Sequence, residues 1–377
     1  MRSINELLEE ILNKIGISEK IHIDEIESSR IFLDKLNKYF YQNSNGYISE
    51  FHEYWKKNHE TILNFKIDHE QALKIALKFD EIFSNKNKFS EIEISPSIDK
   101  RGISKNNIAN VRFFTAIQDF KINIYKKGRD PFQEYKINPE WFNAEDIIKD
   151  DNIIFKFLNY LEATGSQGDK RAKWMKGAAK FLLENCDGEA YKIFELCNQD
   201  VLEVRNLLAG DLGIGFSRKK ADMFIRDMLD WGVWETNKNL EYLNVASDAN
   251  TMRVALRTGL LQPSIPLLAS YLDIYGLQYG LTDDKTQEAW RYVWNLWKQL
   301  PDNSCPPAPA SMDYLIYKSI GKKNCLKNAR KCSKCIMDDI CPESKRKLKS
   351  PKAISIKGMT GWDSGQTDEG GGGGIMS

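Results

Sequence analysis

The sequence predicts an all-α protein, and three observations carry that prediction. Apolar residues recur three and four positions apart in residues 5–15, 70–83 and 286–300, which is the spacing of one face of a helix. Alternation of apolar and polar residues, the pattern of a half-buried strand, is scarce. No unit of roughly 20–50 residues repeats along the chain, so a solenoid or propeller is not expected.

The last of these helical segments indicates how the helices pack. Trp290, Trp294 and Trp297 fall on one of its faces. A stripe of this kind belongs to a protein core far more often than to a surface on which nucleobases stack, so we expect it to be buried. Asp283 or Asp284 stands where the N-cap of this helix is expected.

Composition places the chain among ordinary globular proteins. Hydrophobic residues make up 42% and charged residues 28% of the sequence, and no apolar run approaches the length of about 18 residues that a membrane span needs. The N-terminal stretch MRSINELLEEILNKIGI lacks the features of a secretory signal. We therefore expect a cytoplasmic protein without membrane contact. Its seven cysteines are then expected to be ligands or buried residues rather than disulfides.

Charge is distributed unevenly along the chain. The net charge is only +1, but residues 318–352 hold twelve Lys and Arg against three Asp and Glu. A basic C-terminal segment on a slightly acidic body is expected of a face that contacts phosphates, although a solvated lysine-rich surface has the same composition. The four histidines all lie in the first 69 residues. Chemistry in the rest of the chain must therefore use Lys, Asp, Glu, Cys or hydroxyl groups.

Breaks in composition divide the chain into four regions. Residues 1–148 form an N-terminal helical region without a catalytic motif, and its role is open. Residues 149–243 form a helical domain that carries a glycine-bearing turn near its end. Residues 244–350 form a second helical domain that ends in a cysteine cluster. Residues 351–377 contain five consecutive glycines and are expected to be a flexible tail.

The cysteine cluster is the strongest motif in the sequence. Cys325, Cys332, Cys335 and Cys341 are spaced C-x6-C-x2-C-x5-C. Four thiolates this close together can bind Zn²⁺ or a [4Fe–4S] cluster. Zinc ribbons usually present two CxxC pairs, so one pair flanked by two lone cysteines suits zinc poorly. The remaining cysteines are expected to be small buried residues; they are Cys186, Cys197 and Cys305.

The cysteine segment also resembles a known family. The sequence NCLKNARKCSKCIMDDICPESK, residues 324–345, is similar to the iron–sulfur loop of endonuclease III and of the adenine-mismatch DNA glycosylases. The similarity covers the cysteine spacing, the basic residues after the first cysteine and the Ile-Met-Asp-Asp-Ile stretch. The resemblance implies a [4Fe–4S] cluster that fixes a loop facing DNA phosphates. It assigns the phosphate contacts to Lys327, Arg330, Lys331 and Lys334.

A helix-hairpin-helix should precede the cluster in such a protein, and residues 212–224 resemble one. Gly213 and Gly215 allow positive φ angles and bring backbone amides close to a phosphate. The helix that follows would point its positive N-terminal end at the same anion. Alone, this Gly-x-Gly pattern also fits an ordinary turn between helices.

The lysine-bearing branch of the family has the pattern Arg-Lys-x-Ala after the hairpin, and residues 218–221 match it. The resemblance makes Lys219 the candidate nucleophile, whose neutral amine attacks C1′ of the deoxyribose, expels the base and leaves a Schiff base. β-Elimination from the Schiff base can then nick the strand. Phe216 and Ser217 are two more residues than the family's turn contains, so Lys220 is an alternative nucleophile.

A catalytic carboxylate follows the lysine in this family. Residues 247–254 resemble the family's Asp-Thr-His-x-x-Arg-Val stretch, which puts Asp248 at the catalytic acid. Arg253 and Val254 keep the register, while Asn250 stands in place of the histidine. A carboxylate beside C1′ can stabilise an oxocarbenium-like transition state. An N-cap is the alternative role for this residue.

Residues 164–170 lie where the family places a glutamine that fills the gap left by a flipped base. Gln167 is the candidate, and a helix-capping turn is the alternative role. The resemblance covers about residues 150–345. It implies a two-lobed helix-hairpin-helix glycosylase with an iron–sulfur domain, to which an N-terminal helical region is added.

The resulting expectation is a DNA glycosylase with AP lyase activity that removes a damaged or modified base from double-stranded DNA. We expect a monomer without a small-molecule cofactor. Three alternatives stay open from the sequence. They are a monofunctional glycosylase in which water attacks, a DNA-binding protein without catalysis, and a zinc-clamped nucleic-acid adaptor.

Overall fold

The computed structural model describes residues 57–345, together with Glu6, Glu9 and Asn13, and it leaves out 59, 62, 96–98, 120–121, 123, 125–127, 166, 211, 264–276 and 327–329. The described part is mostly helical, and its only strands have two residues each, which confirms the all-α class. No helix in this part of the chain combines the length and the apolar character that crossing a membrane requires.

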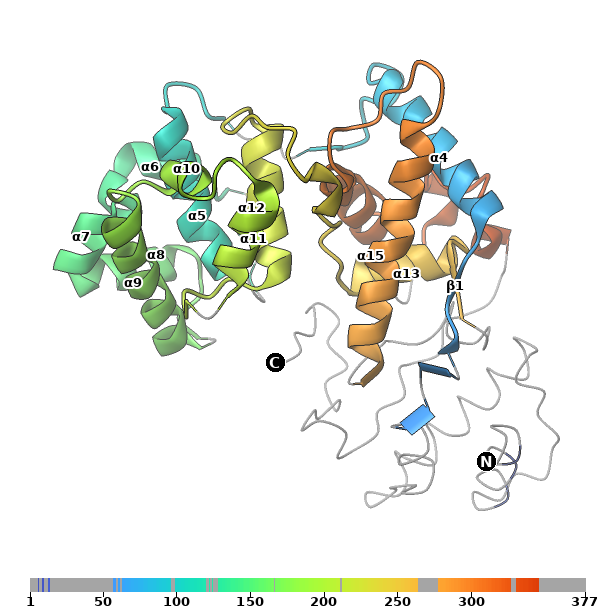
Figure 1. Cartoon of the computed structure of the whole chain (residues 1–377), viewed down its shortest axis with the longest axis horizontal. Helices are drawn as coiled ribbons and strands as arrows, with labels where there is room; N and C mark the ends of the chain where they lie inside the picture. The colour runs from blue at the N-terminus through green and yellow to red at the C-terminus, as the bar shows by residue number, and fades with distance from the viewer. Residues whose placement is uncertain are drawn as a thin grey trace.

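One group of helices forms a first lobe, drawn in teal to yellow-green in Figure 1. Its core gathers aromatic residues such as Phe113, Phe157 and Phe224, all fully buried. Its elements are α5 (Lys105–Gln118), α6 (Pro131–Ile137), η1 (Pro139–Phe142), α7 (Ala144–Lys149), α8 (Asp151–Tyr160), α9 (Gly168–Asn185), η2 (Ala190–Lys192), α10 (Ile193–Leu196), α11 (Val201–Ala209), α12 (Arg218–Asp230) and η3 (Leu240–Tyr242).

Several of these helices begin at a residue whose side chain caps them. Ser104 accepts a hydrogen bond from the N–H of Asn107 ahead of α5, and Asp200 accepts one from Leu202 ahead of α11. Such caps satisfy N–H groups that have no partner within the helix, and they fix where each helix starts.

A second lobe, drawn in blue and in orange to red in Figure 1, packs around a separate core. Its elements are β1 (Lys66–Ile67), α4 (His69–Ser84), α13 (Ala249–Arg257), β2 (Leu261–Gln262), α15 (Leu277–Lys298), η5 (Leu315–Lys322), η6 (Cys332–Lys334) and η7 (Pro342–Lys345). The strands pair antiparallel, with Lys66 opposite Gln262 and Ile67 opposite Leu261. η4 (Pro309–Met312) joins the lobes, because Ala310 belongs to the first core and Met312 to the second.

The tryptophan stripe lies inside this second core, as expected. Trp290 and Trp297 are fully buried and Trp294 is almost so. Phe79 of α4 stacks on Trp290 with ring centroids 6.1 Å apart and meets Trp297 edge-on at 6.0 Å. This aromatic contact holds α4 along α15 (Figure 1).

The N-cap expected at Asp283 or Asp284 is wrong. α15 already begins at Leu277, so both aspartates lie inside the helix. Residues 277–282 contain no proline, and the helix continues through them because nothing breaks its backbone hydrogen bonds.

Asp80 fastens α4 to the segment that follows α15. Its Oδ1 accepts hydrogen bonds from Trp297 Nε1 at 2.7 Å, from the Ser304 N–H at 2.7 Å and from Ser304 Oγ at 2.8 Å. Burial raises the pKa of Asp80, but these bonds outweigh it and hold the pKa below its usual value. The carboxylate is therefore a charged acceptor that joins two distant parts of the chain.

The described residues before 149 do not pack as a unit of their own. α4 contributes its apolar face to the second core, whereas α5, α6 and α7 belong to the first. The reason is geometric: an amphipathic helix needs a partner for its apolar stripe, and the partner of α4 is α15. The boundary placed at residue 148 therefore does not separate two packing units.

Candidate functional site

The hairpin turn ahead of α12 depends on its two glycines. Gly213 and Gly215 have positive φ angles of 65° and 79°, a region that side chains disfavour. A Cβ on Gly215 would lie 2.6 Å from the ring of Trp174, whereas one on Gly213 would meet nothing within 4 Å. Ile214 between them is buried. The turn is therefore packed at Gly215 and Ile214 and exposes bare backbone at Gly213.

The two additional residues of the turn have defined structural roles. The ring of Phe216 lies 5.2 Å from that of Phe113 and 5.9 Å from that of Phe224, so it joins the first core. Ser217 is the N-cap of α12, and its Oγ accepts a hydrogen bond from the backbone N–H of Lys220. The two residues complete the turn and start the helix.

Lys220 is turned into its own lobe. Its side chain is buried, and Nζ donates hydrogen bonds to the carbonyl oxygens of Ile117 at 2.7 Å and Gly215 at 2.9 Å. The amine also lies 5.0 Å above the ring of Trp174. Burial lowers the pKa of Lys220 to about 8. Lys220 therefore stabilises the hairpin turn by joining its backbone at Gly215 to the end of α5.

Lys219 points elsewhere, because consecutive residues of a helix lie about 100° apart around its axis. It shares a face of α12 with Arg226, seven residues further on, and that face meets the second lobe. Burial raises the pKa of Asp283 and of Asp313, and the charge of Lys219 opposes both shifts. The half-buried Lys219 thus lies among carboxylates of the second lobe.

Asp248 begins α13 and forms a capping box. Its Oδ1 accepts hydrogen bonds from the N–H groups of Asn250 at 2.8 Å and Thr251 at 2.9 Å, while Thr251 Oγ1 accepts one from the Asp248 N–H at 2.7 Å. The N-cap role is therefore real, and the carboxylate is rigidly oriented by it. Its Oδ2 accepts from Nδ2 of Asn250 at 2.9 Å.

A chain of hydrogen bonds runs from Asp248 toward the first cysteine. Asn250 bonds Asp248 with its amide nitrogen and accepts with its oxygen from Arg253 Nη2 at 2.6 Å. Arg253 Nε in turn donates to the carbonyl oxygen of Cys325 at 2.8 Å. The asparagine that replaces the family's histidine thus connects the candidate acid to the cysteine loop.

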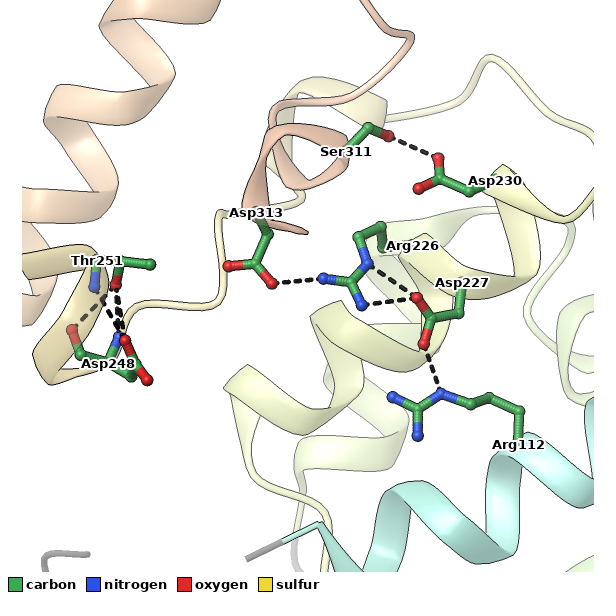
Figure 2. A network of polar contacts seen from close by, with 8 residues as sticks. All are labelled: Arg112, Arg226, Asp227, Asp230, Asp248, Thr251, Ser311 and Asp313. Atoms are coloured by element: carbon green, nitrogen blue, oxygen red, sulfur yellow. Dashed lines mark hydrogen bonds and ion pairs between the residues drawn. The ribbon is translucent and has the colours of Figure 1, made fainter. Parts of the chain in front are cut away.

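A buried ionic network crosses between the lobes, as Figure 2 shows. In the first lobe, Arg112 Nε donates to Asp227 at 2.5 Å, and Asp227 accepts from Arg226 at 2.6 and 2.9 Å. Arg226 Nη1 then donates to Asp313 of the second lobe at 2.5 Å. Each of the four side chains is at least 94% buried.

The charges of both candidate catalytic residues act on Asp313. Burial raises its pKa to about 6, Arg226 and Lys219 oppose the rise, and Asp248 adds to it. Lys219 from one lobe and Asp248 from the other are thus both close enough to act on one carboxylate. Burial also raises the pKa of Tyr317 on η5, to which Asp248 and Asp313 contribute.

The four cysteines of the loop are near one another. Burial raises the pKa of Cys335 to about 11 and of Cys341 to about 12, and the neighbouring Cys325 adds to both. Arg257 Nη1 lies 3.5 Å from Cys325 Sγ, and Cys341 Sγ lies 3.3 Å from the Arg257 carbonyl oxygen. In the described part of the chain, however, no three His, Cys, Asp or Glu side chains are arranged to hold a metal ion.

The four thiols have the residue type that a thiolate-bound cluster needs, although no three of them are arranged as its ligands among the described residues. Each thiol disfavours ionisation of the next, and a bound cationic centre would reverse that. The other cysteines behave largely as expected. Cys186 and Cys197 are buried, while Cys305 is only partly so.

The basic residues of the loop divide into two kinds. Arg330 forms an ion pair with Glu343 at 3.1 Å, in which both side chains are largely buried, so it ties the loop to η7. Lys331 and Lys334 are exposed. Lys327 lies outside the described residues. The two exposed lysines therefore remain the candidates for phosphate contacts, and Arg330 gains a structural role.

Gln167 occupies the N-cap position of α9 with a positive φ of 59°, and its side chain makes no capping bond. The helix-capping alternative for its side chain is therefore not what the structure has. Gln167 stays a prediction.

Sequence reasoning missed Arg226, Asp227, Asp313 and Glu343. The first two sit one after the other in α12, where burial of adjacent charges is unusual. The sequence carried a signal for both residues, because charged residues of α12 occur on the face of the helix that is buried. No pattern in the sequence around Asp313 marked it as a functional residue.

Comparison with known proteins gives no further identification. No family model matches the chain, and no curated protein matches it.

Proposed function

We propose that this protein is a DNA glycosylase that removes a damaged or modified base from duplex DNA, with Lys219 as the nucleophile and Asp248 as the catalytic carboxylate. The observation that carries the proposal is that Lys219 of one lobe and the capped Asp248 of the other both act on the pKa of the same buried Asp313. The hairpin glycines and the exposed lysines of the cysteine loop supply phosphate contacts around that point.

Chemically, the neutral amine of Lys219 attacks C1′ and the base leaves with the electron pair of the glycosidic bond. The carboxylate of Asp248 stabilises positive charge that develops on the sugar. Its capping bonds hold it in one orientation, so little reorganisation is needed during the reaction. The hairpin places Lys219 in the first turn of α12, where Lys220 is already engaged with backbone carbonyls.

The test is a screen of duplexes with different damaged or modified bases for base release, followed by borohydride trapping on the substrate that is cleaved. Lys219→Gln should abolish trapping, whereas the matched control Lys220→Gln should keep it. Asp248→Asn should slow base release about 10²–10³-fold, as lost electrostatic contacts to developing charge do. If only Lys220→Gln prevents trapping, the nucleophile is Lys220. If no variant affects base release, the proposed site is wrong.

A monofunctional glycosylase is the second candidate. Asp248 is held in one orientation by its capping bonds and can orient a water molecule, so catalysis does not require an amine nucleophile. In that mechanism water attacks C1′ with Asp248 as the base. Base release that depends on Asp248 but gives no trapped Schiff base would establish it. DNA binding without release of any base would leave a non-catalytic DNA-binding protein.

We further propose that Cys325, Cys332, Cys335 and Cys341 bind a [4Fe–4S] cluster that fixes the loop. The purified protein should then contain about four irons and absorb broadly near roughly 400 nm. Cys332→Ser should lower its yield, because the loop loses a ligand on which its fold depends. A colourless protein with one zinc would instead support the zinc-clamped adaptor.

A further inference from the structure

We propose that Asp313 is a further functional carboxylate of this site, which holds the amine of Lys219 in place and accepts its proton during the attack on C1′. The inference rests on the proposed function and extends it to a residue that comes from the segment between η4 and η5. It acts through Lys219, so it is a positioning residue that also takes part in proton transfer.

The two oxygens of Asp313 have different surroundings. The side chain is 6% exposed, and Oδ2 accepts the hydrogen bond from Arg226. Oδ1 is also buried, yet it has no hydrogen-bond partner among the described residues. A buried carboxylate oxygen without a partner is costly, and native proteins keep few of them. Figure 2 shows this oxygen turned away from Arg226, toward the side on which α13 begins with Asp248.

The rest of the network fixes where that oxygen points. Arg226 also donates two hydrogen bonds to Asp227, and Asp227 accepts another from Arg112 of the first lobe. A guanidinium bonded on two sides cannot rotate without breaking a buried ion pair. Asp313 is therefore aimed by the first lobe although it belongs to the second.

Four charged or titratable groups face Asp313. Lys219 and Arg226 approach it from α12, Asp248 from α13 and Tyr317 from η5. Burial raises the pKa of Asp313 to about 6, so the carboxylate is ionised at neutral pH but accepts a proton more readily than an ordinary aspartate. Arg226 is already bonded on both sides, which leaves Lys219 as the cation that Oδ1 can bind.

The proton steps balance as follows. The neutral amine of Lys219 forms a bond to C1′, the C1′–base bond breaks, and its electron pair leaves on the base, which takes a proton from solvent. The nitrogen now carries one proton too many and gives it to Asp313. As the sugar ring opens to the Schiff base, the same proton passes from Asp313 to the ring oxygen O4′ and regenerates the carboxylate.

The experiment compares Asp313→Asn with Asp222→Asn. Asp222 of α12 is the matched control, because it too is a buried carboxylate paired with an arginine, 3.6 Å from Arg205, and burial raises its pKa to about 7. Single-turnover base release by the wild-type protein should fall as the pH is lowered through about 6, where Asp313 becomes protonated. Asp313→Asn should be about 10²-fold slower at neutral pH and should lose that pH dependence.

Asp222→Asn should keep both the rate and the pH dependence, and Asp313→Glu should restore part of the rate. A rate that rises in Asp313→Asn, or a pH dependence that survives in it, would overturn the proposal. Thermal unfolding of each variant separates loss of fold from loss of proton transfer, since a merely structural Asp313 would lower the midpoint and leave the pH profile of the folded fraction unchanged.

A second measurement needs no DNA. Acylation of Lys219 by a small amine-reactive reagent, followed by mass spectrometry, should be roughly three- to tenfold faster in Asp313→Asn than in wild type, because the amine is released from the carboxylate that holds it. The rate in Asp222→Asn should be unchanged. An unchanged rate in Asp313→Asn would overturn the contact between the two residues. If this pair is confirmed but no base is released from any duplex, the proposed function fails by itself.

Discussion

The two lobes are assembled from the chain in opposite ways. The first lobe uses mainly one continuous stretch, α5 to η3, whereas the second combines α4 from before that stretch with α13, α15 and η5 from after it. Each lobe also has a carboxylate that joins distant segments, the buried Asp227 in the first and the partly buried Asp80 in the second. The comparison teaches that a lobe closed by long-range contacts cannot be delimited along the sequence.

The largest expected difference between the lobes comes from those two carboxylates. Asp227→Ala removes the anion between Arg112 and Arg226 and should destabilise the protein by about 3–5 kcal/mol. Asp80→Asn weakens hydrogen bonds to Trp297 and Ser304 and should cost only about 1–2 kcal/mol. Urea unfolding followed by tryptophan fluorescence measures both.

The Asp80 effect should depend on pH. Its folded pKa lies below the usual 3.8, so its contribution is complete above that pH and disappears as the pH falls through the folded value. Asp99→Asn, which breaks an exposed pair with Arg101, should leave the midpoint unchanged. Equal losses from Asp80→Asn and Asp227→Ala would contradict the difference between the lobes.

A smaller effect separates the two hairpin glycines within the first lobe. Gly213→Ala adds strain only from its positive φ and should cost about 1 kcal/mol. Gly215→Ala adds a clash with the Trp174 ring and should cost about 2–4 kcal/mol. Thermal unfolding ranks the two. If Gly213→Ala proved the more damaging, the packing described for the hairpin would be incorrect.

The smallest effect belongs to the cysteine loop of the second lobe. Lys334→Ala should reduce the slope of log Kd against log salt by about one unit, because it removes one phosphate contact. Arg330→Ala should leave the slope nearly intact and instead lower the stability of the loop, since Arg330 is paired with Glu343. Binding titrations at several salt concentrations distinguish the two, and an equal loss of slope in both variants would assign Arg330 to DNA.

The sequence was sufficient for features whose cause is local. The helical class, the burial of the tryptophan stripe and the capping position of Asp248 follow from spacing and residue type over a few positions. It was insufficient where the cause is distant. Asp313 binds Arg226 across 87 positions, and Asp80 binds Ser304 across 224. No pattern within either segment indicates its partner.

The surroundings of the two adjacent lysines could not be predicted from the sequence either. Whether Lys219 or Lys220 faces the second lobe depends on the residue at which α12 begins, and Ser217 sets that start with a single capping bond. The two-residue excess in the turn suggested a shifted register. In three dimensions Phe216 packs into the core, so the excess is absorbed before the helix begins.

The position of α4 has a consequence for synthesis on the ribosome. Its apolar face, which includes Ile75 and Phe79, packs with α15 in the second core, and α15 begins at Leu277. At about 5–20 residues per second, roughly 10–40 s pass between the emergence of the two helices. During that interval the first lobe can fold, while the apolar face of α4 still lacks α15 as a packing partner. The second core can therefore close only late in synthesis, after the whole first lobe from α5 to η3 has emerged.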